Sequence, residues 1–340
     1  MLHIMPQDLK QSMLPAIENE MEEIISQVDN HGYQQFHEMM AYHLGWVGEG
    51  AGPEARGKRF RPLLLLLSCA ATGSGWEKAL PAAAAVELLH NFSLIHDDIE
   101  DNSPLRRGRE TVWKKWGIPQ AINSGDAMLT LAHMAMLRLD KFVPPDILFQ
   151  AVRLLQETCL RLTRGQYLDI DFEKRENVSI QEYWQMVEGK TAALISTCAS
   201  LGALIGGAEP RTCQQYQDFG FYLGLAFQAQ DDLLGIWGDS AITGKSNESD
   251  LICGKKTLPV LFGLSRNGEF AARWKLGNIQ PSEVSQLAAM LESEGGLTFS
   301  QEETSRLTLL ALEHLQQAIP QEPAKGILIE ITNKLLKRTG

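Results

Sequence analysis

Apolar residues recur three and four positions apart along most of the 340-residue chain, and no alternation of apolar and polar residues extends beyond a few positions. This spacing places apolar side chains along one face of an α-helix, whereas a half-buried strand needs alternation. Prolines fall near several expected helix starts, where their fixed φ and missing N–H are tolerated. We therefore predict an all-α protein with helices near residues 8–29, 35–45, 58–72, 76–102, 119–140, 145–170, 179–206, 211–237, 257–266, 281–293, 300–318 and 322–337.

The composition favours one large domain. Apolar residues make up 44% of the chain and charged residues 21%, which is the balance of an average soluble globular protein. No internal repeat, low-complexity tract or linker interrupts the sequence, so we expect a single helical bundle over residues 1–340. Two pairs of glycines spaced one turn apart, Gly202 with Gly206 and Gly220 with Gly224, predict close packing between helices.

Charge and cysteine usage restrict the partners and the compartment. The formal net charge of −11 argues against a nucleic-acid partner. Five cysteines without a CxxC pair indicate reduced thiols, and Lys10 is the only lysine or arginine in the first thirty residues, so we expect a cytoplasmic protein without a targeting peptide. The uncharged stretch 191–208 has the length of a membrane span, but its threonines, serines and glycines predict a buried bundle helix instead.

Four carboxylates end one of the most apolar predicted helices. Asp97 and Asp101 are four residues apart and project from one face, whereas Asp98 is displaced by about 100°. Acidic groups are unfavourable at a helix C-terminus, and a bound magnesium ion would reverse that balance. The alternative is a solvated acidic helix end.

A second acidic cluster follows another apolar helix. Gln228, Asp231 and Asp232 stand at its end, with apolar residues and a glycine on the turns below Asp231. Two such helices facing each other would enclose a deep apolar cavity with carboxylates at its mouth. Magnesium prefers a few carboxylates plus substrate phosphates, so this arrangement suits a magnesium-bridged diphosphate above a hydrocarbon tail.

Basic residues bracket the first acidic cluster. In an acidic chain, such groups near helix starts are candidate phosphate ligands, because guanidinium and free N–H groups both bind oxyanions. For any single side chain, ordinary surface ion pairing is the alternative. The candidates are Lys58, Arg59, Arg61, Arg106, Arg107, Arg109, Lys190, Lys245, Lys255 and Lys256.

From about Lys58 to Lys256, the motifs and their order resemble those of the trans-isoprenyl diphosphate synthases, or polyprenyl synthetases. The family's first aspartate-rich motif matches DDIED at Asp97 to Asp101, and its second matches DDLLG from Asp231. The resemblance implies a helical bundle of the isoprenoid-synthase type, prenyltransferase activity, three Mg²⁺ ions in the active site, and a homodimer.

The resemblance also implies roles for individual residues. Asp97, Asp101 and Asp231 would bind the magnesium ions, and Arg106, Lys190 and Lys245 would hold the allylic diphosphate. Isopentenyl diphosphate would be bound by Lys58, Arg61, His90 and Arg107. Lys255 would close over the site, and Thr191 and Gln228 would turn oxygen atoms toward the developing cation. A second shell behind the metals would consist of Asp98, Gln166, Asp169, Asp232 and Asp250.

The second motif departs from the family pattern at one position. Many members carry a third aspartate where this chain has Gly235, and one extra residue separates Lys245 from Asp250. Because only the first aspartate of that motif has to reach the metal, Asp231 is expected to suffice.

Product length is expected to depend on the residues one turn before Asp97, which are Phe92 and Ser93. This pair resembles that of geranylgeranyl diphosphate synthases, so we expect a twenty-carbon product, with farnesyl diphosphate as the alternative. A class I terpene cyclase would not need a second diphosphate site, a noncatalytic synthase subunit would be expected to lack an acidic cluster, and a metal-dependent hydrolase would release diphosphate without a longer product.

Overall fold

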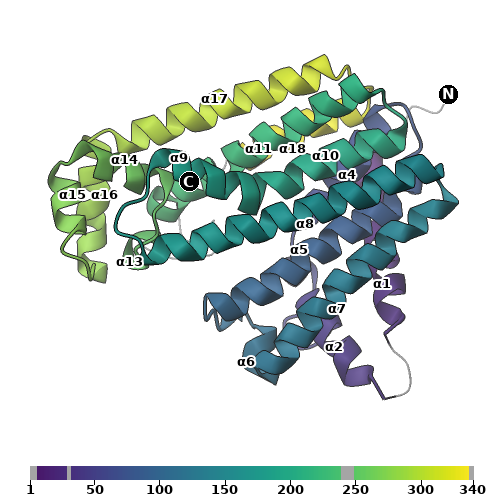
Figure 1. Ribbon diagram of the computed structural model, residues 1–340, viewed down its shortest axis with the longest axis horizontal. Helices are drawn as coiled ribbons and strands as arrows, with labels where there is room; N and C mark the ends of the chain where they lie inside the picture. Colours follow the sequence, from purple (N-terminus) through teal and green to yellow (C-terminus); the bar gives the residue numbers. More distant parts are fainter. Residues whose placement is uncertain (1–5, 29–31, 239–248, 337–340) are drawn as a thin grey trace. The chain divides into compact units, whose positions relative to one another are not determined.

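The computed structural model describes residues 6–28, 32–238 and 249–336, and most of them are helical (Figure 1). The chain divides into two compact units, each assembled from three stretches of sequence. The first unit contains 1–156, 198–213 and 320–327, and the second contains 157–197, 214–319 and 328–340. Four helices contribute residues to both units: α8 (Pro145–Lys174), α10 (Ala193–Gly206), α11 (Pro210–Trp237) and α18 (Ala324–Leu336).

The first unit is organised around α5 (Leu80–Glu100), which lies beside α7 (Ile118–Leu137) and also contacts α1 (Pro6–Ser26) and α4 (Phe60–Ala71). The leucines of α4 and the alanines in the first half of α5 are almost fully buried, so their burial stabilises this contact. The shorter elements of this unit are α2 (Gln34–His43), α3 (Pro53–Arg56), η1 (Glu77–Ala79), β1 (Leu105–Arg106), β2 (Arg109–Glu110), α6 (Val112–Trp116) and η2 (Arg138–Lys141).

The second unit packs its core around α14 (Leu258–Arg266), which contacts α9 (Ile180–Val187) and α17 (Gly296–Gln317). Leu258 and Leu261 are buried in this core together with Val187 of α9 and Leu307 of α17. The remaining elements are η3 (Glu188–Ala192), which is a π-helix, α13 (Ser249–Ile252), α15 (Glu269–Trp274), η4 (Pro281–Glu283) and α16 (Val284–Ser293).

The prediction of an all-α protein is confirmed, with three local corrections. The segment 105–110 forms a short antiparallel hairpin where no strand was predicted. The helix predicted over 179–206 is divided by the π-helical turn η3. The short helices α3, α6, α13 and α15 were also missed, because each is too short to show a helical repeat of apolar residues.

Both glycine pairs lie at close helix contacts, as predicted. A Cβ atom at Gly202 would come within 2.2 Å of the Leu65 carbonyl oxygen, and one at Gly224 within 2.5 Å of Ala192 Cα. The stretch Ile180–Gly206 is long and apolar enough to cross a membrane, but 89% of its apolar 18-residue segment is buried inside the protein. This burial agrees with the prediction of a core helix.

Candidate active site

The first acidic cluster divides between two environments at the end of α5. Asp98 is 1% exposed and accepts a hydrogen bond from Arg106 Nε at 2.8 Å. Burial raises the pKa of Asp98 to about 6, although the nearby Arg106 guanidinium opposes that shift. Asp97 is half-buried, and the exposed Asp101 caps the helix by donating its N–H to the Asp97 carbonyl. Asp98 therefore anchors the segment that follows α5 through its bond to Arg106.

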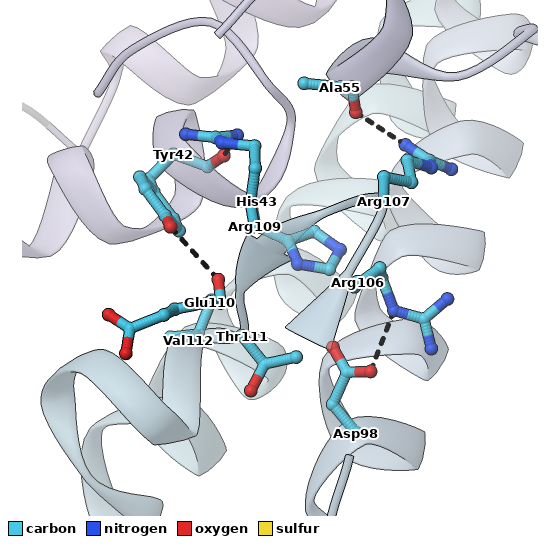
Figure 2. A pocket seen from close by; sticks show the side chains of 10 residues that line it. All are labelled: Tyr42, His43, Ala55, Asp98, Arg106, Arg107, Arg109, Glu110, Thr111 and Val112. Atoms are coloured by element: carbon cyan, nitrogen blue, oxygen red, sulfur yellow. Dashed lines mark hydrogen bonds and ion pairs between the residues drawn. The ribbon is translucent and has the colours of Figure 1, made fainter. Parts of the chain in front are cut away.

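The hairpin β1–β2 presents two arginines from a tight turn (Figure 2). Its two central residues, Arg107 and Gly108, have φ values of 52° and 74°, as a two-residue hairpin turn requires. This conformation costs a non-glycine residue roughly 1 kcal/mol. The turn thereby directs Arg106 toward Asp98 and Arg107 toward Ala55, whose carbonyl accepts a hydrogen bond from Arg107 Nη1 at 2.8 Å.

Arg61 and His90 form the centre of a second basic group in the same unit. Arg61 Nη1 lies 3.1 Å from His90 Nε2, and because arginine only donates, Nε2 must be the acceptor and Nδ1 must carry the proton. Burial and then the charges of Arg61, Arg107 and Arg106 hold the pKa of His90 well below its usual range, so the imidazole is neutral. Arg61 Nε is buried and has no hydrogen-bond partner among the described residues.

Arg59 is the residue before α4 and fixes the start of that helix, with Lys58 before it and Arg61 in the first turn of α4. It is 4% exposed, adopts a left-handed backbone with φ of 46°, and forms ion pairs with Glu18 at 2.6 Å and Glu87 at 3.0 Å. A third partner is the Leu44 carbonyl, which accepts a hydrogen bond from Arg59 Nη2 at 3.1 Å.

 The sequence alone shows three neighbouring cations here, and the structure assigns them different environments.

Gly57 lets Arg107 lie against the segment that leads into α4. Gly57 has a φ of 75°, and a Cβ atom there would lie 2.7 Å from Arg107 Cζ. Lys58, which follows Gly57, is exposed. Of the four residues expected to bind isopentenyl diphosphate, the structure thus brings Arg61, His90 and Arg107 into one electrostatic cluster and places Lys58 on the adjoining segment.

In the second unit, the π-helix η3 carries Lys190 and Thr191. Such turns insert an extra residue into a helix and are frequent at functional sites. Lys190 Nζ forms an ion pair with Asp169 of α8, and Thr191 Oγ1 donates to Gln228 Oε1 at 2.8 Å. The structure therefore joins four of the predicted site residues in two pairs.

Asp232 lies at the centre of a buried hydrogen-bond network. It accepts bonds from Tyr183 Oη at 2.6 Å, from Gln228 Nε2 at 2.9 Å and from the backbone N–H of Leu258 at 2.8 Å. Burial raises the pKa of Asp232 to about 7 despite these donors. Asp232 thus ties α11 to α9 and to the first turn of α14, whereas the preceding Asp231 is half-buried.

The position of Gly235 explains the departure in the second motif. A Cβ atom at Gly235 would lie 1.8 Å from Asp250 Oδ2, so the Asp250 carboxylate occupies the space that a longer side chain would need. Gln166 is buried in α8, and Lys255 is exposed. Lys245 lies outside the described residues.

The carboxylate chemistry fits magnesium bound together with a phosphate ligand. Within residues 6–28, 32–238 and 249–336, no three side chains of His, Cys, Asp or Glu are close enough to form a metal cage. Magnesium usually takes one or two carboxylates and completes its shell with water and phosphate oxygens. The expected cavity with carboxylates on both walls stays a prediction, because the two acidic clusters belong to different units.

Sequence reasoning missed three polar residues of this region. Glu87 forms an ion pair with Arg59, and Tyr183 donates a hydrogen bond to Asp232. Both lie at buried helical positions, and in the sequence each is only a polar residue within an apolar run. The third is His43, the last residue of α2, which lines a pocket with Arg106 and Arg107. A histidine shortly before the basic segment was the available signal for it.

Comparison with known proteins assigns the family. The family model described as polyprenyl synthetase matches residues 52–292. A (2E,6E)-farnesyl diphosphate synthase of Mycobacterium tuberculosis is 39% identical over 297 residues, which cover 84% of this chain and 82% of that protein. A geranylgeranyl diphosphate synthase of the same species is 41% identical over 266 residues, covering 76% and 75%.

Solved structures agree with that assignment. The polyprenyl synthetase of Streptomyces coelicolor A3(2) has a TM-score of 0.85 and 35% sequence identity, over 96% of this chain and 99% of that one. The predicted isoprenoid-synthase fold and the predicted enzyme class are therefore confirmed. On this evidence, the chain belongs to the polyprenyl synthetase family of prenyltransferases.

Proposed function

We propose that this short-chain trans-prenyl diphosphate synthase condenses isopentenyl diphosphate with an allylic diphosphate to give geranylgeranyl diphosphate. The observation that carries the proposal is the cluster of Arg61, His90 and Arg107, which adds a second basic group beside the Asp98–Arg106 pair at the acidic end of α5. A class I terpene cyclase binds one diphosphate and has no need of a second basic group. A noncatalytic synthase subunit would be expected to lack one of the two acidic motifs, and both are present.

Three magnesium ions are proposed as cofactors, held by Asp97 and Asp101 on one side and by Asp231 on the other. When bound, magnesium would neutralise the diphosphate and so assist its departure from the allylic carbon. Asp98 would support this function by holding Arg106, and Asp169 by holding Lys190. Asp250 is proposed to support the second motif from the space beside Gly235.

The protein's own residues bind, orient and shield the substrates. Arg106 and Lys190 would hold the allylic diphosphate, while Lys58, Arg61, His90 and Arg107 would hold isopentenyl diphosphate with its double bond toward the reacting carbon. Thr191 and Gln228 would turn oxygen atoms toward the developing positive charge, with Gln166 behind them and Lys255 closing the site. Since no side-chain base can be assigned, the released diphosphate is the proposed acceptor of the proton lost after the new C–C bond forms.

Product length is proposed to depend on Phe92 and Ser93. Ser93 lies one turn before Asp97, is buried and donates to the His90 carbonyl at 2.8 Å. Phe92 packs edge-on against His96, one turn further on, with ring centroids 4.8 Å apart. A bulky residue beside a small one supports a twenty-carbon limit. The farnesyl diphosphate synthase among the relatives keeps a fifteen-carbon product as the second candidate.

The decisive experiment is incubation of the purified protein with magnesium, labelled isopentenyl diphosphate and each allylic primer in turn. Chromatography of the dephosphorylated products should show a twenty-carbon alcohol. Phe92→Ala should lengthen the product and Ser93→Phe should shorten it. An unchanged product length in both variants would remove Phe92 and Ser93 from the proposal, and release of diphosphate without a longer product would indicate a hydrolase.

We also propose that the protein acts in the cytoplasm as a homodimer, with residues 1–340 working as a single domain. The five cysteines without a CxxC pair support the cytoplasmic location, and the family resemblance supports the homodimer. Size-exclusion chromatography with light scattering would test the dimer directly.

A further inference from the structure

A small pocket in the first unit brings His43 beside the two hairpin arginines (Figure 2). Its walls come from the end of α2, from α3, from the hairpin and from the last turn of α5. In Figure 2 the His43 imidazole points into the space between the side chains of Arg106 and Arg107. The same imidazole acts electrostatically on His90, so it belongs to the cluster that contains Arg61 and Arg107.

The arginines around this pocket are already held by protein groups. Arg106 pairs with Asp98 and Arg107 donates to the Ala55 carbonyl. Arg109 donates to the carbonyls of Glu49, Tyr42 and Val47 at 2.9, 2.8 and 2.7 Å. The His43 imidazole, in contrast, has no hydrogen-bond partner among the described residues. A half-buried polar group without a partner is costly unless a ligand or water supplies one.

The charge around His43 favours an anion as that ligand. Burial, followed by the charges of Arg106, Arg107, Arg59 and Arg109, holds the pKa of His43 well below its usual value. The imidazole is therefore neutral near pH 7 and carries one N–H that can donate. Asp98, the carboxylate that lines the pocket from α5, is engaged by Arg106.

The position of His43 is fixed from both sides. The bonds from Arg109 tie the segment after α2 to the hairpin. On the other side, Gly45 packs so tightly that a Cβ atom there would lie 2.6 Å from the backbone of Ala55 and Arg56. A ligand would therefore meet a histidine that is already positioned, with little further ordering to oppose binding.

We propose that His43 donates a hydrogen bond to a phosphate oxygen of isopentenyl diphosphate bound at Arg107. This inference rests on the proposed function and adds a substrate-binding residue to it. Neither acidic motif nor the basic segment before α4 contains His43.

The test compares two variants of His43 with a control on the same helix. His43→Phe keeps a ring and removes the donor, whereas His43→Gln keeps a donor. Since a hydrogen bond to a charged group is involved, His43→Phe should raise the KM for isopentenyl diphosphate about tenfold or more and leave the KM for the allylic primer within about twofold. His43→Gln should have a smaller effect, and His37→Phe on α2 should have none.

A binding measurement keeps the test independent of folding defects. The imidazole nitrogen signals of His43 in the wild-type protein, identified by their loss in His43→Gln, should shift when isopentenyl diphosphate is added without primer. An unchanged KM for isopentenyl diphosphate, a KM effect confined to the primer, or unshifted His43 signals would each overturn the inference. Failure of the wild-type protein to form any prenyl product would instead reject the proposed function.

Discussion

The contact between Gly165 of α8 and the π-helix η3 gives the sharpest prediction. A Cβ atom at Gly165 would lie 2.1 Å from Lys190 N, 2.6 Å from Gly189 C and 2.7 Å from Lys190 Cα. All three are backbone atoms, so none of them can rotate away. Ordinary van der Waals contact begins at 3.4 Å, and Gly165→Ala must therefore push the two backbones apart by roughly 1 Å.

This displacement should affect both stability and turnover. Overpacking of this kind costs about 1–3 kcal/mol, of which the better helix propensity of alanine recovers up to about 1 kcal/mol. Because η3 carries Lys190 and Thr191, the same shift moves Lys190 away from Asp169 and displaces Thr191 relative to Gln228. A misplacement of about 1 Å can reduce turnover roughly 100-fold.

Urea unfolding and steady-state kinetics of purified Gly165→Ala measure the two effects. The matched control is Gly326→Ala in α18, where the new Cβ would meet only the end of the Glu322 side chain, at 3.2 Å. That variant should be as stable as the wild type, or more stable by up to about 1 kcal/mol, with unchanged turnover. Wild-type stability in Gly165→Ala would contradict the packing argument. Normal turnover in a destabilised Gly165→Ala would contradict the role given to η3.

Three further predictions concern the acidic motifs, the basic cluster and the buried network. Asp97→Ala and Asp231→Ala should each lower turnover at saturating magnesium by at least about 100-fold with the fold retained, and near-normal kcat in either would discard its metal role. Arg107→Ala and His90→Ala should raise the KM for isopentenyl diphosphate more than that for the primer; equal effects would mean that the two diphosphate sites are misassigned. Because burial raises the pKa of Asp232 from its ordinary 3.8 to about 7, the folded state retains a proton that the unfolded state has lost, so stability falls as pH rises from about 4 to 7. The free energy of unfolding, measured with urea at pH 5 and at pH 8, should differ less between the two pH values in Asp232→Asn than in the wild type. An equal difference in the two proteins would assign the titration to another group.

Helical periodicity was sufficient to predict the long elements, because apolar faces repeat over many turns. The helices α8 and α11 begin at Pro145 and Pro210, within one residue of their predicted starts. The hairpin that carries Arg106 and Arg107 could not be found in the same way, since strands of two residues show no alternation. Its turn also uses Arg-Gly rather than the asparagine- or aspartate-glycine pairs that usually mark such hairpins.

The residue types at the candidate site were predictable, but their partners were not. The sequence spacing separated Asp98 from the face of Asp97 and Asp101, and the structure adds that Asp98 binds Arg106. Nothing in the sequence indicated that Arg59 pairs with Glu87, because these residues are 28 positions apart and meet only through helix packing.

The ion pair between Glu18 and Arg59 joins the N-terminal helix to the segment that is proposed to bind isopentenyl diphosphate. Glu18 of α1 also accepts a bond from Trp46 Nε1 at 2.6 Å, so one carboxylate joins α1, the segment after α2 and the start of α4. A shortened version of the protein that begins after α1 would leave the buried Arg59 with Glu87 as its remaining carboxylate partner, next to Lys58 and Arg61. Engineers who trim the chain for crystallisation or expression should therefore keep α1, although every residue of the two aspartate-rich motifs lies downstream of it.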